Sequence, residues 1–158
     1  MNIIVIDPGL DGAISFVRHD NQEVRDMPTV NIGNGKKVRR EIDLHEMVSI
    51  LIEADPREWK VVIEKVHSMP GQGVRSMFSM GRSFGNVEAA VIALGFPLEY
   101  VTPQAWKKEM MNGQGKEKDA SRQKAMQIFP GIADQLTRKK DHGRADALLI
   151  AEYGRRKL

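Results

Sequence analysis

The sequence contains no cysteine, which excludes disulfides, zinc–thiolate sites and a cysteine nucleophile. It has no apolar run long enough to cross a membrane, and its first residues lack the basic-then-apolar pattern of a secretory signal. We therefore expect a cytoplasmic protein. The sequence shows no internal repeat, low-complexity tract or interdomain linker, so we expect residues 1–158 to form a single domain with a sizeable core.

Charge is distributed unevenly along the chain. Residues 1–103 carry 11 Lys and Arg against 14 Asp and Glu, whereas residues 104–158 carry 13 against 7. A basic C-terminal third favours an anionic partner, most often nucleic acid. A solvated basic surface that keeps the protein soluble would explain the same distribution.

Apolar periodicity and turn residues predict strands first, joined by the turn PGLDG, and then strands alternating with helices. This order indicates a three-layer α/β domain. The polar stretch NIGNGKKVRR (31–40) is expected to be a mobile loop. The expected strands are 2–7, 12–18, 22–27, 59–66 and 97–103, and the expected helices are 42–54, 77–95, one from Pro103, 118–129 and 143–156.

Three acidic residues stand beside the most hydrophobic segments of the chain. Asp7 ends the first strand, Glu64 lies near the end of VVIEKV, and Asp146 lies at the start of the last helix. An ionised carboxylate is costly to bury without a partner, and a divalent cation such as Mg²⁺ or Mn²⁺ would compensate all three. Each acid alone has an ordinary explanation. Asp7 can cap the turn, Glu64 can pair with Lys65 or a distant arginine, and Asp146 can be an acid that the helix dipole favours in the first turn.

A fourth group can come from the segment KKDHGRADALL. His142 and Asp146 are four residues apart and share a helix face. Asp141 is five residues from Asp146, about 140° round a regular helix, and reaches the same site only from the preceding loop. The spacing therefore favours His142 over Asp141, although an ordinary surface histidine explains His142 as well.

Three motifs in this order resemble those of RuvC-type Holliday junction resolvases: VIDPGLDGAI, VIEKV and DHGRADALLIAEYG. The last of them is most similar to the phage and prophage branch. The resemblance implies a ribonuclease H-like fold with a mixed five-stranded sheet, and carries the metal-ligand role to Asp7, Glu64 and Asp146. RuvC proteins place an acid or histidine three residues before the final aspartate, where this chain has Gly143; His142 and Asp141 are the shifted candidates.

The same resemblance implies a homodimer that cuts four-way DNA junctions by two-metal phosphodiester hydrolysis in a bacterial or phage-infected cell. We expect Mg²⁺ or Mn²⁺, two ions per site, with no nucleotide cofactor and no membrane partner. The long helix 77–95 is the expected dimer interface, because Gly81, Gly85 and Ala89 form a row of small residues. That row can equally pack against the protein's own sheet.

DNA contacts are expected from the basic and glycine-rich segments. Candidate phosphate contacts are Lys107, Lys108, Lys116 and Lys118. The loop HSMPGQGVRS follows Glu64 and contains Arg75 and Met69, the latter matching a residue that wedges into the branch point in RuvC relatives. Solvated lysines and a gap-filling methionine are the ordinary alternatives.

Two other functions use the same fold. One is a nuclease acting on RNA–DNA hybrid or structured RNA, which would share the metal site. The other is a non-catalytic DNA-binding module, which three acids disfavour because they repel phosphate unless a metal is present.

Overall fold

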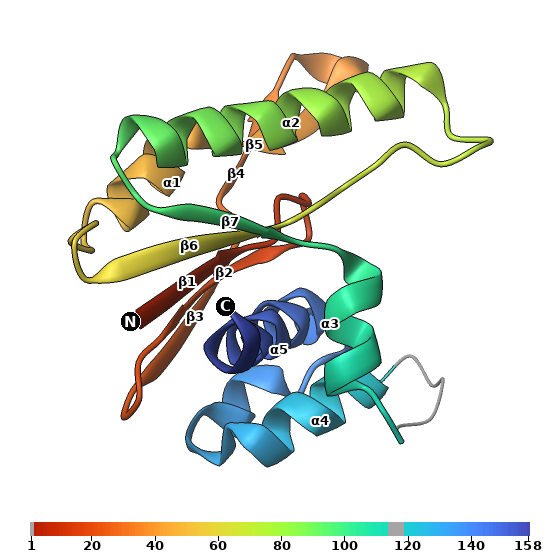
Figure 1. The fold of residues 1–158 in the computed structure, drawn as a ribbon. Helices are drawn as coiled ribbons and strands as arrows, with labels where there is room; N and C mark the ends of the chain where they lie inside the picture. Colours follow the sequence, from red (N-terminus) through yellow and green to blue (C-terminus); the bar gives the residue numbers. More distant parts are fainter. Residues whose placement is uncertain (1, 114–118) are drawn as a thin grey trace.

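A computed structural model of the chain describes residues 2–113 and 119–158 (Figure 1). Its main sheet has five strands in the order β3-β2-β1-β6-β7. Strand β1 is antiparallel to β2 and parallel to β6, so the predicted mixed α/β sheet is confirmed. The strands are β1 (Asn2–Ile6), β2 (Ala13–Val17), β3 (Gln22–Asp26), β6 (Trp59–Glu64) and β7 (Leu98–Val101).

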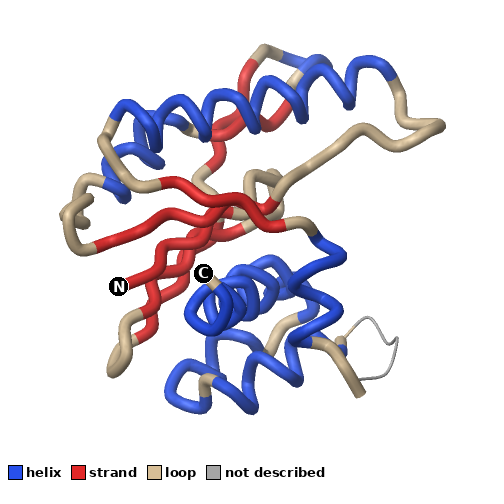
Figure 2. The backbone as a smooth tube through the Cα atoms, viewed as in Figure 1, coloured by secondary structure: helices blue, strands red, loops and turns tan. Residues whose placement is uncertain are grey.

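Helices cover both faces of this sheet (Figures 1 and 2). One face carries α1 (Leu44–Leu51) and α2 (Val74–Ala93). The other carries α3 (Pro103–Met110), α4 (Ala120–Ile128) and α5 (His142–Lys157), with short 3₁₀ turns at Pro130–Leu136 and Lys139–Asp141. None of the helices within these described ranges is both long and apolar enough to cross a membrane.

The alternation of side chains along the central strands determines which face carries the acids. Ile3 and Val5 of β1 and Val62 of β6 belong to the core beneath α5. Successive strand residues point to opposite faces, so residues two apart share a face. Asp7 therefore continues the series of Ile3 and Val5, and Glu64 continues from Val62. Both acids reach the α5 side of the sheet at the same end of two neighbouring parallel strands.

The stretch 31–40 is not the loop that its polar composition predicted. Residues Thr29–Ile32 and Arg39–Ile42 pair as the antiparallel strands β4 and β5 of a separate two-stranded sheet, with a 3₁₀ turn at Gly35–Lys37 between them. Gly33 and Gly35 have φ values of 103° and 55°, conformations that side chains disfavour, and they allow the chain to reverse. The glycines that indicated a loop therefore form a hairpin turn.

Helix α5 lies directly against the turn that follows β1. A Cβ atom at Gly143 would lie 2.2 Å from the carbonyl oxygen of Asp11, and one at Gly12 would lie 2.3 Å from the carbonyl oxygen of Asp7. Both positions therefore require glycine, and the first turn of α5 is held next to Asp7.

Replacing Gly143 with alanine should move α5 away from this turn. We expect Gly143→Ala to lower the free energy of unfolding by about 1–3 kcal/mol, the usual cost of overpacking. Gly154→Ala is the matched control on the same helix, since a Cβ there would lie 3.6 Å from Ile3 Cγ2, an ordinary contact, and alanine should not lower the stability. Urea denaturation of both variants measures the difference; equal stability of Gly143→Ala and wild type would contradict the packing.

Candidate active site

Asp7 occupies the first residue after β1 and is anchored through its backbone and its side chain. Its N–H donates to the carbonyl oxygen of Ala13 at 3.0 Å, and its Oδ1 accepts the N–H of Gly9 at 3.0 Å. The turn-capping role is therefore real, but it leaves Oδ2 of the same carboxylate available. Burial raises the pKa of Asp7, whereas the Gly9 N–H and then His142 lower it.

Glu64 ends β6, in register with the strand that delivers Asp7. Its Oε1 accepts a hydrogen bond from the indole Nε1 of Trp106 at 2.7 Å. Burial raises the pKa of Glu64, the Trp106 hydrogen bond lowers it, and the nearby Asp7 and Asp146 raise it further. Lys65 is not its partner: the ammonium of Lys65 lies over the Tyr100 ring, 5.2 Å from the centroid.

Asp146 lies one turn into α5 and points toward the same place. Its Oδ1 is buried and has no hydrogen-bond partner. Burial raises the pKa of Asp146; the Ser121 hydroxyl and Lys107 lower it, and Asp7 raises it. An orphaned carboxylate oxygen in a buried position is costly, and a cation would satisfy it.

One lysine faces all three acids. Lys107 lowers the pKa of Asp7, of Glu64 and of Asp146, so its ammonium lies within electrostatic reach of each. Among residues 2–113 and 119–158, Lys107 is the lysine whose charge acts on all three acids.

His142 accompanies the acids, whereas Asp141 does not. His142 lowers the pKa of Asp7 and of Asp146. The buried carboxylate of Asp141 instead accepts the guanidinium of Arg138 at 2.8 Å and its backbone N–H at 2.8 Å, and the Arg138 side chain lowers the pKa of Asp141. A side chain at Gly143 would clash with the carbonyl oxygen of Asp11, so this position itself cannot supply a fourth group.

Carboxylate oxygens and an imidazole are donors of the kind that hold a divalent cation, but these side chains are not gathered around a common point in this structure. Across residues 2–113 and 119–158, no three His, Asp or Glu side chains stand close enough together to enclose an ion. The acids are neighbours whose charges repel, and the buried free oxygen of Asp146 supplies the vacant ligand atom that a hard cation requires. Asp7, Glu64, Asp146 and His142 are the residues that can hold it.

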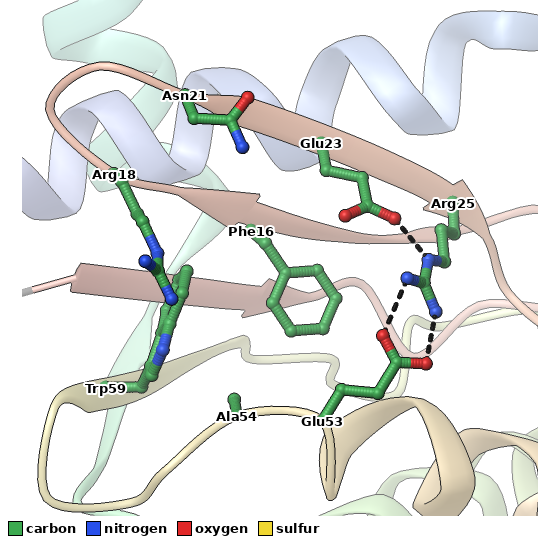
Figure 3. A pocket seen from close by; sticks show the side chains of 8 residues that line it. All are labelled: Phe16, Arg18, Asn21, Glu23, Arg25, Glu53, Ala54 and Trp59. Carbon is green, nitrogen blue, oxygen red and sulfur yellow. Dashed lines mark hydrogen bonds and ion pairs between the residues drawn. The ribbon is translucent and has the colours of Figure 1, made fainter.

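A hollow beside the acids leads to solvent. It has a volume of about 500 Å³ and is lined by Asp119, Ser121, Lys139, Lys140, His142 and Asp146. A second hollow, shown in Figure 3, lies by Trp59 at the opposite end of β6 from Glu64. In this second hollow Arg25 is neutralised by Glu23 and Glu53, so the Arg25 guanidinium is not free to bind an anion.

The predicted DNA contacts are scattered around this site. Lys107 and Lys108 are exposed on α3, and Arg75 is exposed at the start of α2. Met69 is 60% exposed in the loop after β6, as a wedge would require. Lys116 and Lys118 lie outside the described residues.

The sequence interpretation missed two residues of the site. Trp106 donates a hydrogen bond to Glu64, and the Ser121 hydroxyl acts on Asp146. No local sequence motif marks either residue. Trp106 reaches Glu64 because α3 packs against the sheet and α5, and Ser121 reaches Asp146 because α4 packs against α5. The spacing of PQAWKK after a strand is the sole available signal for Trp106.

The three raised pKa values predict how stability changes with pH when no metal is present. Between the ordinary carboxyl pKa, about 4, and the raised pKa values, the folded state binds more protons than the unfolded state. The contribution of these acids to the free energy of unfolding therefore falls as pH rises through that window. Ion-paired acids such as Asp26, whose pKa is lowered by Arg144, give the opposite trend. The difference in free energy of unfolding between wild type and Asp146→Asn cancels the contribution of these ion-paired acids.

The free energy of unfolding of Asp146→Asn should rise relative to wild type as pH increases from 4 to 7 without metal, because the variant carries no charge to desolvate. Adding Mg²⁺ should reverse the order by stabilising wild type alone. Urea denaturation across this pH range tests both statements. A difference that is independent of pH and Mg²⁺ would place Asp146 outside a shared electronegative site.

Comparison with known proteins shows similarity to junction-resolving enzymes. No family model matches the chain. Over 101 residues it is 35% identical to the Holliday junction resolvase MOC1, chloroplastic, of Chlamydomonas reinhardtii. The alignment covers 64% of this chain and 12% of that relative, so the chain spans only a small part of its length.

Solved structures extend the similarity to nearly the whole chain. Thermus thermophilus RuvC in complex with a Holliday junction substrate matches with a TM-score of 0.59 and 17% identity, covering 99% of this chain and 97% of that one. A second structure of RuvC from the same organism matches with a TM-score of 0.50 and 17% identity, covering 99% and 96%. The chain thus has the fold of RuvC, and its resemblance to RuvC-type Holliday junction resolvases is confirmed.

Proposed function

We propose that this protein is a metal-dependent endonuclease that resolves four-way DNA junctions. The observation that carries the proposal is that Asp7 and Glu64 lie at the same end of β1 and β6 with Asp146 of α5 near them, and that a buried oxygen of Asp146 has no partner. The similarity to a Holliday junction resolvase and to RuvC bound to a junction substrate supports four-way DNA as the substrate.

Two Mg²⁺ or Mn²⁺ ions per site suit this donor set. Asp7, Glu64 and Asp146 would supply their carboxylate ligands, and His142 is the remaining candidate ligand. The chemistry that such ions supply when bound is activation of a water for in-line attack and stabilisation of the leaving 3′-oxygen. The expected products are 5′-phosphate and 3′-hydroxyl ends.

The protein's own groups bind and orient the scissile phosphate. Lys107 partly neutralises the acids before the substrate binds. The same ammonium would contact the phosphate once cations neutralise the carboxylates. If His142 does not ligate a metal, its imidazole accepts the proton of the attacking water, since a histidine can change charge near neutral pH. Lys108, Lys116, Lys118 and Arg75 extend the phosphate track, and Met69 wedges into the branch point.

A homodimer matches the twofold symmetry of a junction that is cut on two opposed strands. Helix α2 is the proposed interface. A Cβ at Gly81 or Gly85 would meet nothing within 4 Å, so this row does not pack against the protein's own sheet. Phe78 on the same helix is 73% exposed, which leaves apolar surface for a partner to cover. The cytoplasm of a bacterial or phage-infected cell remains the expected location.

Replacing Asp7 with asparagine tests the metal site directly. Asn keeps the Oδ1 acceptor for Gly9 and removes the charge, so junction cutting should fall by at least about a thousandfold while binding stays within a few-fold. The assay maps nicks with Mg²⁺ on a four-way junction, a linear duplex and an RNA–DNA hybrid. Symmetric nicks on opposed junction strands are expected from wild type.

Three results would contradict the proposal. Full activity of Asp7→Asn would remove this carboxylate from the chemistry. Preferential cutting of the hybrid by wild type would replace the junction with RNA–DNA as the substrate, and binding without cutting of any substrate would leave a DNA-binding module.

Lys107 should contribute to junction binding as well. Lys107→Gln removes one phosphate contact, so the slope of log affinity against log salt should decrease by about one. Lys36→Gln is the control, an exposed lysine in the turn between β4 and β5 to which no DNA contact is assigned. Fluorescence anisotropy with Ca²⁺ in place of Mg²⁺ measures both slopes. An unchanged slope in Lys107→Gln would exclude this lysine from the phosphate track.

A further inference from the structure

Trp106 is a buried side chain in direct contact with a candidate metal ligand. Its side chain is fully buried in the core beneath α5, and its indole Nε1 donates to Glu64 Oε1 at 2.7 Å. An indole N–H is a donor only, so this contact cannot reverse its direction. Hydrogen bonds to a charged acceptor are among the stronger ones in proteins.

The path of the chain fixes this donor rigidly. Strand β7 pairs in parallel with β6, and Val101 lies opposite Glu64 in the register. Helix α3 starts two residues later, with Thr102 as its N-cap accepting the N–H of Ala105. The first turn of α3 therefore brings Trp106 beside Glu64 without a flexible linker.

The contact engages one of the two oxygens of Glu64. The indole occupies Oε1, which leaves Oε2 as the oxygen available to a cation. A glutamate side chain loses considerable rotamer freedom when it is ordered, and a fixed donor imposes that ordering before any ion binds. Lys107 follows in the chain, its ammonium 5.3 Å from the centroid of the Trp106 ring, so the same turn of α3 carries both the donor and the counter-charge.

We propose that Trp106 is a positioning residue that holds Glu64 ready to ligate a divalent cation and thereby sets the affinity of the site. The inference rests on the metal site of the proposed function and assigns a role to a residue outside the ligand set. It applies to ion binding itself and does not depend on which nucleic acid is cut.

Trp106→Phe removes the N–H and keeps an aromatic ring in the core. Isothermal titration of Mn²⁺ alone should show affinity weakened by about tenfold to a hundredfold, the usual effect of losing a group that orients a ligand. Trp59→Phe is the matched control: Trp59 is also buried, on the same strand β6 as Glu64, but packs edge-on against Phe16. Its Mn²⁺ affinity should stay within about twofold of wild type, because distant sites act independently.

Nitrogen-15 NMR of the native sequence keeps the inference testable if Trp106→Phe fails to fold. The two tryptophans give two indole N–H signals, and Trp59→Phe identifies the one from Trp106. Mg²⁺ titration should shift the Trp106 signal and leave the Trp59 signal in place. An unmoved Trp106 signal at saturating Mg²⁺, or equal Mn²⁺ affinity of Trp106→Phe and wild type, overturns the inference.

The outcomes separate this inference from the proposed function. Weaker Mn²⁺ binding by Trp106→Phe, in a protein that cuts no junction, supports the positioning role while the nuclease proposal fails. Mg²⁺-dependent junction cutting with the same half-saturating Mg²⁺ concentration in Trp106→Phe and wild type supports the nuclease and refutes the positioning role.

Discussion

The parallel pairing of β1 with β6 is the constraint on which the candidate site depends. Ile6 lies opposite Ile63 in this register, so the next residues, Asp7 and Glu64, lie side by side at the ends of the two strands. A shift of one residue would turn Glu64 to the other face, toward α1 and α2. The apolar residues that specify the register therefore also specify which carboxylates meet.

Helix α5 completes the site at close quarters. Glycine at positions 12 and 143 lets the helix start touch the turn after β1, and the buried hydroxyl of Ser15 donates to the carbonyl oxygen of Ala147 at 3.0 Å, next to Asp146. These contacts hold Asp146 against its two neighbours despite their repulsion. The core on the α5 face thus bears the electrostatic cost of gathering three acids, a cost that a bound cation would lower.

Much of this arrangement followed from the sequence because it depends on local patterns. Apolar strands ending in Asp7 and Glu64 predicted carboxylates at strand ends, and the four-residue spacing of His142 and Asp146 predicted a shared helix face. The contact between Trp106 and Glu64 joins residues 42 apart through the docking of α3, which no local pattern encodes. The hairpin of β4 and β5 was missed because its glycines and lysines are also typical of loops.

Anomalous diffraction from crystals soaked in Mn²⁺ tests the central claim most directly, since it locates the ions themselves. We expect two anomalous peaks between Asp7, Glu64 and Asp146, with one of them in contact with the buried oxygen of Asp146. Saturating Mn²⁺ with no peak at these three carboxylates would contradict it.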